Sequence, residues 1–509
     1  MRIGLSVLVA VTVLAPAVAR PASDAQVVSL RVTHQSFNEH RPWTKGTPST
    51  RIGSAVVLRD SLLLTESKLI RNAILIQVQK NGSATRVSAR VVHSDEDIDL
   101  ALLEVDEPGF FDDLEAAQFA KSAPGEGTVY STRWQNQQYE ISESQIAGIN
   151  VRESPYGSIT HAFLSLHTNL SNGGWAEPVF SDDKLIGLSV LQEGQRATVI
   201  PVEILSAYVR GARSTTRGTG TANDPGFASF RPYWQFGQDP ALAAYLGLMG
   251  KPRGVVLRWI PWGSTGCDAL EPWDLILSVD GHDLDAMGNF EHPHYGQLAF
   301  QHILVDGHRP GDRVRFQLLR NGEILDVDVE LHRNPGANWL IPNHRDQTQP
   351  PYLVAGGLVL RELDGNYLRA WGNDWRTTAP PKLVQRYDRE RESQTEERRR
   401  ILILSQVLPD PHNLGYHQLA NLALAEINGR SVYSVAEADE AFRHPVDGFH
   451  RLKFYRDDLR GEIVLDAADF AEATARVLEN YDIPTPIRLR PPGGERATVD
   501  CDPQAPEYR

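Results

Sequence analysis

A hydroxyl, an imidazole and a carboxylate together can carry out acyl transfer, and this sequence holds candidates for all three groups in its first half. Ser171 is a candidate nucleophile, His161 or His167 a candidate base, and Asp99 a candidate for orienting a base. The reaction needs the base within hydrogen-bond reach of the nucleophile and a third group that holds the base. Both histidines also fit ordinary strand positions, with rings that are either hydrogen-bonded or exposed to solvent.

Metal and cofactor chemistry have weaker support in the sequence. His292 and His294 are close in the chain, but no third ligand lies within reach by sequence, and zinc sites need three or four protein ligands. There is no phosphate-binding loop, Cys-x-x-Cys pair or dinucleotide-binding fingerprint. We therefore expect no metal site and no cofactor.

The candidate acyl-transfer residues lie among short apolar runs separated by turn residues, which predict an antiparallel, mainly β domain over residues 26–212. The strands that we expect most clearly are 54–58, 61–65, 73–79, 86–93 and 100–105.

A Thr- and Gly-rich linker over 213–226 separates this domain from the rest of the chain. Residues 227–335 then predict strands, a helical stretch and a hairpin that turns at Asn321-Gly322, a sequence favoured in type I′ turns. A second unit of similar pattern runs over 401–488, so the chain contains an internal repeat of about 100 residues.

The segment 336–400 connects the two repeats and ends in a charged run over 386–400. Charges of both signs at helical spacing predict a solvated helix or linker held by i,i+4 pairs, without a function of its own. A Pro-rich tail over 489–509 closes the chain.

Residues 1–19 have the pattern of a signal peptide: Arg2, an apolar run over 5–14, and Ala17-Val18-Ala19 as a cleavage motif. The apolar run is too short to span a bilayer and no later run is longer, so we expect no membrane span. The protein is expected to be exported, with the periplasm as its location.

With 509 residues, 41% of them hydrophobic, the chain should form several domains. The net charge of −14 argues against a nucleic-acid partner, because phosphate backbones select basic surfaces. Cys267 and Cys501 are the two cysteines. They make no disulfide framework, and whether they form one long-range bridge stays open.

The order and spacing of several segments resemble the Deg/HtrA family of trypsin-like serine proteases with PDZ domains. In the first domain the resemblance rests on segments 53–58, 63–70, 92–103, 173–180, 185–188 and 199–202. Segments 352–357 and 404–416 resemble the branch of that family found in plants and bacteria, in which a second, modified PDZ domain follows the first.

The resemblance implies a chymotrypsin-like double β-barrel followed by two PDZ-like α+β domains. It places Lys68 at the position of the general base and Trp175 at that of the nucleophile, whereas Asp99 matches the family's acid. Lys68 is protonated near neutral pH unless it is deeply buried, and it faces no hydroxyl at position 175. We expect the Trp175 indole to fill part of the cleft and Glu177, which replaces a glycine, to crowd the turn that would present oxyanion-hole amides.

PDZ domains bind an extended peptide as an added strand and capture its terminal carboxylate with a preceding loop. In the first repeat we expect this role at one loop and strand, formed by Gly250, Lys251, Arg253, Gly254, Val255, Val256 and Leu257. The second repeat lacks a comparable loop, and we expect it to serve an interface.

The leading hypothesis is therefore an exported pseudoprotease that binds peptides, unfolded proteins or partner proteins through its PDZ domains. One alternative is an active, divergent serine endopeptidase that uses Ser171. Another is a subunit that forms homo-oligomers or co-assembles with an active homologue.

Overall fold

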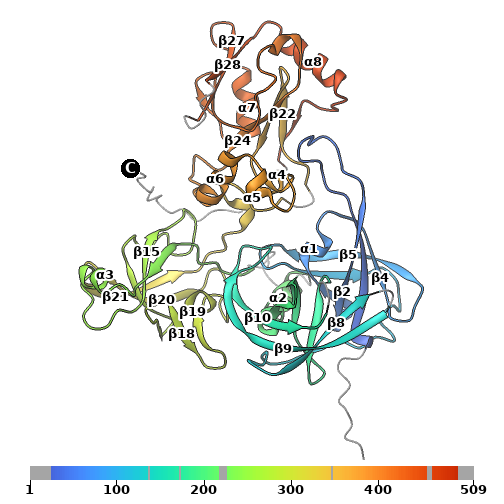
Figure 1. Ribbon diagram of the computed structural model, residues 1–509, viewed down its shortest axis with the longest axis vertical. Helices are drawn as coiled ribbons and strands as arrows, with labels where there is room; N and C mark the ends of the chain where they lie inside the picture. The colour runs from blue at the N-terminus through green and yellow to red at the C-terminus, as the bar shows by residue number, and fades with distance from the viewer. Residues whose placement is uncertain are drawn as a thin grey trace, which may run out of the picture.

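The computed structural model describes residues 24–490 apart from 136–137, 171–173, 217–225, 346–347 and 456–460. A double β-barrel comes first, and two α+β domains follow it (Figure 1). The expected signal peptide, most of the 213–226 linker, Ser171 and nearly all of the tail lie outside the described residues.

The first barrel is closed by six antiparallel strands in the order β1-β2-β3-β6-β5-β4. Their apolar side chains, Val28, Leu30 and Leu63 among them, fill its core. The predicted strands 73–79 and 100–105 are confirmed as β4 and β6. The bounds are β1 Val27–His34, β2 Ser49–Val57, β3 Leu62–Thr65, β4 Ala73–Gln79, β5 Arg86–Asp95 and β6 Leu100–Val105.

Six strands also close the second barrel, because β12 pairs with β11 as well as with β13. The helix α2 (Val202–Thr216) packs against its side. The strands are β7 Gln118–Phe119, β8 Thr128–Gln135, β9 Gln138–Glu153, β10 Thr160–Thr168, β11 Glu177–Ser181, β12 Lys184–Glu193 and β13 Arg196–Pro201, of which β7 lies outside the ring.

The first α+β domain has the strand order β14-β15-β16-β20-β21. Asn321 and Gly322 have φ angles of +52° and +82°, as the expected type I′ turn between β20 and β21 requires. The elements are β14 Tyr233–Phe236, α3 Pro240–Tyr245, β15 Val255–Trp259, β16 Leu275–Val279, β17 His282–Asp283, β18 Asn289–His292, β19 Gly296–Ala299, η3 Phe300–His302, β20 Arg313–Arg320 and β21 Glu323–Glu330.

The hairpin β18–β19 docks this domain onto the second barrel. Between its strands, Tyr295 donates its hydroxyl to the Ala123 carbonyl at 3.1 Å and also to the Glu203 carboxylate. His302 of η3 approaches β10, where its Nδ1 accepts the Ala162 amide at 3.4 Å. The packing of the two domains therefore depends on buried polar groups.

Two histidines at this junction make stability depend on pH. Burial lowers the pKa of His161 to about 3 and that of His302 to about 4, from an ordinary value of 6.5. Between pH 6.5 and about 4 the unfolded state therefore binds more protons than the folded state. We expect the free energy of unfolding to fall as the pH is lowered through this window. Each of the two histidines should contribute a loss on the order of 1 kcal/mol for each pH unit.

Urea denaturation at several pH values would measure this loss. In the His161→Phe variant the dependence on pH should be shallower than in the unmodified protein. An equal slope in both proteins would assign the effect to other groups.

The second α+β domain is built on a sheet with the order β28-β27-β25-β24-β23-β22-β29. Its run from β23 to β28 repeats the order of β14 to β21, as the internal repeat predicts. The elements are β22 Tyr352–Ala355, β23 Leu358–Glu362, α4 Gly365–Arg369, α5 Trp375–Thr378, α6 Pro381–Glu390, β24 Leu402–Val407, η5 Pro411–Asn413, β25 Leu422–Ile427, β26 Arg430–Ser431, α7 Val435–Phe442, β27 Phe449–Phe454, β28 Glu462–Asp466, α8 Phe470–Asn480 and β29 Ile487–Arg488.

The boundary expected at residue 401 falls inside this sheet. The strands β22 and β23 precede residue 401 and pair with each other. β23 also pairs with β24, from Leu358 opposite Val407 to Glu362 opposite Leu402. The helices α4 to α6 separate β23 from β24, and a short strand carries no sequence pattern that identifies so distant a partner. Both β22 and β23 were therefore expected in the connecting segment.

The expectation of a solvated helix over 386–400 is wrong for much of that run. The helix α6 ends at Glu390, and Arg386, Glu392, Gln394 and Arg400 are buried. The Arg231 guanidinium of the first α+β domain pairs with the Glu392 carboxylate. Arg386 and Glu390 form an i,i+4 pair as expected, but Glu392 is buried by a partner from another domain, which the local sequence does not show.

Cys267 is disulfide-bonded, and Cys501 lies outside the described residues. Among the described residues, no helix has both the length and the apolar character needed to cross a membrane.

Candidate functional site

Lys68 and Trp175 contact each other where the two barrels meet. They stand at the positions expected for a base and a nucleophile. Lys68 lies in the short helix α1 (Ser67–Ile70), with its Nζ 4.5 Å from the centroid of the Trp175 ring and 2.8 Å from that of Tyr156. The Arg51 guanidinium lies over the same indole at 4.8 Å. A cation over an aromatic face is attracted by the ring's electrons, by about 0.5–2 kcal/mol. The two positions therefore form a stabilising stack.

Two buried carboxylates lie next to this stack. Asp99 accepts the backbone N–H of Lys68 at 2.7 Å, and Glu66 accepts that of Ala176 at 2.6 Å. Burial, with Asp99 nearby, raises the pKa of Glu66 well above its usual value. Asp99 thus holds the backbone of the residue at the base position, as a capping carboxylate does.

Burial lowers the pKa of Lys68 to about 8, against the opposing effect of Glu66 and Asp99. At neutral pH the amine is therefore still mostly protonated, so it is a poor proton acceptor.

The turn around Trp175 is held by carboxylates of the chain itself. Glu177 Oε1 accepts the Gly174 amide at 2.8 Å and the Arg133 guanidinium at 2.5 Å. The two side chains are only 3% and 6% exposed. The expectation that Glu177 crowds this turn thus holds in a specific form: its carboxyl group accepts a turn amide. Burial raises the pKa of Glu177, and the Arg133 guanidinium opposes that shift. An amide that donates to Glu177 is not free to stabilise an oxyanion.

The indole of Trp175 is half-buried and packs against the core of the first barrel. A Cβ on Gly53 would lie 2.8 Å from the Trp175 Cβ, so the close approach of the two backbones needs glycine at position 53. The Ser54 amide donates to the Trp175 carbonyl at 2.9 Å and fixes this approach. The tryptophan is therefore held against the first barrel by both its side chain and its backbone.

The histidines considered as alternative bases have other contacts. His161 is buried, donates its Nδ1–H to the Ala162 carbonyl at 2.7 Å and stacks on Phe163 at 3.9 Å between ring centroids. His167 is an exposed residue of β10. Ser171 lies outside the described residues.

The structure groups His292 with His302 and Asp306, whose potential ligand atoms lie within 4.8 Å of one another. His294 instead bonds to the Ala123 carbonyl. The Nδ1 of His292 accepts two backbone amides, at 3.2 and 3.1 Å, which places its proton on Nε2. A metal ligand needs a free lone pair at that nitrogen. In this group the His292 Nε2 lies 3.9 Å from the Asp306 carboxylate, so the contact between them is electrostatic.

The residues expected to bind a peptide lie in a loop and a strand without a free edge. β15 pairs with β14 and with β16 at both Val255 and Val256, and Leu257 bonds to residues 273 and 274. A Cβ on Gly254 would lie 2.2 Å from the Ile276 carbonyl oxygen, so this glycine serves the packing of the sheet. Gly250, Lys251 and Arg253 precede this paired strand. The edge strand next to β15 is β14, and β21 forms the opposite edge of this sheet.

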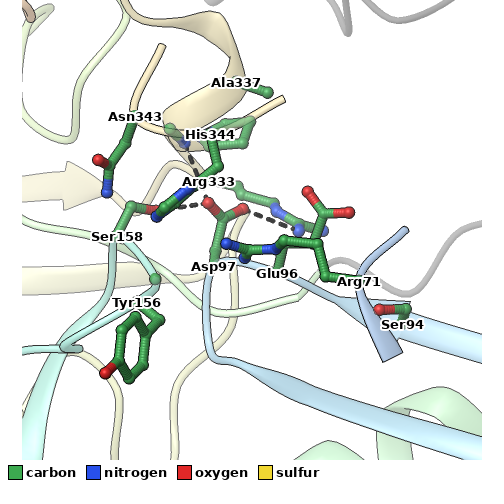
Figure 2. Close-up of a pocket in the computed structure, with 13 residues that line it drawn as sticks. Arg71, Ser94, Glu96, Asp97, Tyr156, Ser158, Arg333, Ala337, Asn343 and His344 are labelled. Atoms are coloured by element: carbon green, nitrogen blue, oxygen red, sulfur yellow. Dashed lines mark hydrogen bonds and ion pairs between the residues drawn. The ribbon is translucent and has the colours of Figure 1, made fainter. Parts of the chain in front are cut away.

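A cavity of about 210 Å³ lies beside the Lys68 stack. Figure 2 shows Tyr156 and Ser158 of the second barrel, Arg71 and Asp97 of the first, and Asn343 and His344 around it. Asp97 accepts the Gly336 amide and the Arg333 guanidinium, each at 3.0 Å, so the segment after the first α+β domain is bound to the barrels here. Sequence reasoning missed this cavity because its walls are far apart in the chain.

The comparisons with known proteins agree with this architecture. A model of the trypsin-like peptidase domain matches residues 53–188, and a model of the PDZ domain matches residues 341–487. Protease Do-like 2, chloroplastic, of Arabidopsis thaliana is 24% identical over 469 residues, which cover 90% of this chain and 74% of that protein. Putative protease Do-like 3, mitochondrial, of the same plant is 22% identical over 88% of this chain and 76% of its own length.

A probable periplasmic serine endoprotease DegP-like of Halomonas elongata is 23% identical over 62% of both chains. Among solved structures, the HtrA-type protease AlgW with a decapeptide aligns with 62% of this chain and 98% of its own, at 18% identity and a TM-score of 0.45. The two domain models and the relatives that span most of the chain show that this protein belongs to the Deg/HtrA family of trypsin-like proteases with PDZ domains.

Proposed function

We propose that this chain is a pseudoprotease, a member of a protease family that binds proteins without cleaving them. The observation that carries the proposal is the direct contact of Lys68 with Trp175, where acyl transfer would need a base and a hydroxyl. Loss of the nucleophile alone can cost on the order of a millionfold in rate. Asp99 cannot compensate, because it has no imidazole to orient.

Incubation with unfolded casein and with a fluorophosphonate probe tests this proposal. We expect neither peptide release nor labelling. Casein cleavage together with labelling at Ser171 would establish the alternative, an active and divergent serine endopeptidase.

We assign peptide binding to the first PDZ domain, at the outer edge of β14. This strand ends its sheet, and Tyr233 and Phe236 are 45% and 42% exposed along it. Trp234 packs on Phe300 with ring centroids 5.5 Å apart, which provides an apolar floor. An unpaired edge beside exposed aromatic groups suits an extended peptide added as a further strand.

Phe236→Glu is expected to weaken peptide binding at least about tenfold, because it puts a charge beside the β14 edge and removes an apolar contact. Fluorescence polarisation with labelled apolar peptides measures the affinity. The matched control is Ile324→Glu, on β21, which is 59% exposed. If Lys251→Ala weakens binding and Phe236→Glu does not, the peptide site is at the 250–254 loop instead.

The second PDZ domain is proposed to act as an interface. The edge of β23 that corresponds to the free edge of β14 is paired with β22 of the same chain. All four side chains of β22 are buried, so displacing it would expose an apolar strand.

We further propose export to the periplasm, in keeping with the N-terminal pattern, and assembly with copies of itself or with an active homologue. Co-expression with an active homologue tests the latter, because mixed oligomers would support it and strictly separate assemblies would contradict it.

A further inference from the structure

The loop that leads into β14 is buried where the domains meet. Residues 226–230 are all buried, and the Ser229 amide donates to the His332 carbonyl at 3.1 Å. Pro232, directly before the strand, is also buried and has no backbone N–H. The loop therefore packs into the junction, and its last residue has no amide to offer a ligand.

Arg231 lies just before β14 and is bound to carboxylates from two other parts of the chain. Its Nε donates to Glu392 at 2.8 Å, and its Nη1 lies 3.6 Å from Glu153. The side chain is 9% exposed, and its guanidinium lies over the Trp339 ring at 4.7 Å. A third carboxylate at this place would be repelled by the two that are there, and it would have to displace a shielded ion pair.

These features affect a peptide that adds to β14 in the antiparallel direction. Such a peptide ends beside the start of β14, because antiparallel neighbours run in opposite directions. A terminal carboxylate is captured by free backbone amides or by a cation. A buried loop, a proline and an arginine held in ion pairs make that end of β14 unfavourable for a carboxylate.

The other end of β14 would receive the terminus of a peptide bound in the parallel direction. There the Gly237 amide donates to the Gly254 carbonyl at 3.0 Å. Asp239 follows, and its carboxylate accepts the Ala241 amide at 2.9 Å as the cap of α3. An occupied amide and an acidic side chain make this end unfavourable for a carboxylate as well.

Between its ends, β14 is suited to the middle of an extended chain. Its outer edge has no partner among the described strands. The rings of Trp234 and Phe236 lie 5.6 Å apart between centroids. Main-chain hydrogen bonds to a strand edge need no chain terminus, and alternate side chains of an added strand would contact these two rings.

We propose that the first PDZ domain binds internal, extended segments of unfolded protein chains and does not select a C-terminal carboxylate. The inference rests on the peptide site proposed above at the β14 edge and adds the class of its ligand. Segments with apolar residues at alternate positions fit best, because one face of such a strand meets the two rings. The affinity for such a segment is independent of whether the chain ends there.

Three versions of one short fluorescent peptide, in which valine and phenylalanine alternate with serine and threonine, test this specificity on the full chain. One has a free C-terminal carboxylate, one has a C-terminal amide, and the third carries the same segment between Gly-Ser spacers on both sides. We expect dissociation constants within about threefold of one another, measured by fluorescence polarisation. Phe236→Glu should weaken all three at least about tenfold, whereas the matched control Ile324→Glu should change none of them.

The possible failures can be told apart. A preference of about tenfold or more for the free carboxylate over both other versions would overturn the inference and leave the β14 site in place. If Lys251→Ala then removes that preference, the carboxylate is captured by the 250–254 loop. If no version binds, or if Phe236→Glu weakens none of them, the β14 site itself is wrong and the inference fails with it.

Discussion

Replacing Lys68 with His and Trp175 with Ser in one variant is expected to leave the protein unable to hydrolyse casein above background. The two changes restore a nucleophile and a base, yet Glu66 and Glu177 keep their hold on the Ala176 and Gly174 amides. Oxyanion stabilisation requires donors that are free and preorganised, and one lost donor costs about a hundred- to a thousandfold in rate.

Activity should return only when these carboxylates are also removed. The variant to test adds Glu66→Asn and Glu177→Gly, the residue types of the family motifs. It also carries Arg133→Leu, because Arg133 would otherwise lose its buried partner. We expect a rise of at least about a hundredfold over the double variant, measured as release of fluorescent fragments from labelled casein.

The matched control is the same variant with Trp175→Ala in place of Trp175→Ser, which should remain at background. If the double variant alone cleaves casein efficiently, the two carboxylates do not block the site.

Glu392→Ala is expected to lower the free energy of unfolding by about 3–5 kcal/mol, the largest loss of stability that we anticipate for a single substitution. Glu392 and its partner Arg231 are 2% and 9% exposed. The Arg231 guanidinium also stacks on Trp339 at 4.7 Å, and Glu153 of the second barrel lies 3.6 Å from its Nη1. Removal of Glu392 would leave a shielded cation underpaired where three domains meet.

Guanidinium chloride denaturation followed by circular dichroism and tryptophan fluorescence would measure the loss. The control is Glu104→Ala, which breaks an exposed pair with Arg90 and should cost at most about 1 kcal/mol. A loss of similar size in both variants would contradict the central role of the Arg231–Glu392 pair.

Local patterns in the sequence predicted much of the first domain and the hairpins of the repeats. The apolar pattern predicted both ends of β4 and of β6 correctly, and Asn321-Gly322 predicted the turn between β20 and β21. These signals act between neighbours in the chain. The family resemblance placed Lys68 and Trp175 at the base and nucleophile positions, but their direct contact was not predicted.

The parts that sequence reasoning missed depend on partners far apart in the chain. Tyr156 completes the Lys68 stack although it is 88 positions away. Glu66 lies in the 63–70 segment, and its role as acceptor of the Ala176 amide is visible only in the structure. The expected peptide-binding strand is a further case: only the pairing of the sheet shows that β15 has two neighbours, whereas β14 has one.

The strand β22 has a consequence for how this protein can be divided. A fragment that starts at residue 401 would lose β22 and β23. The strand β24 would then become an open edge, because β23 is its partner on that side. The first four side chains of β24 are buried in the intact protein. Long apolar edges recruit other chains into mixed sheets and aggregate. The second PDZ domain can therefore be moved into another protein only together with the strands that precede residue 363, and a cut at 401 would turn an ordered domain into a source of insoluble material.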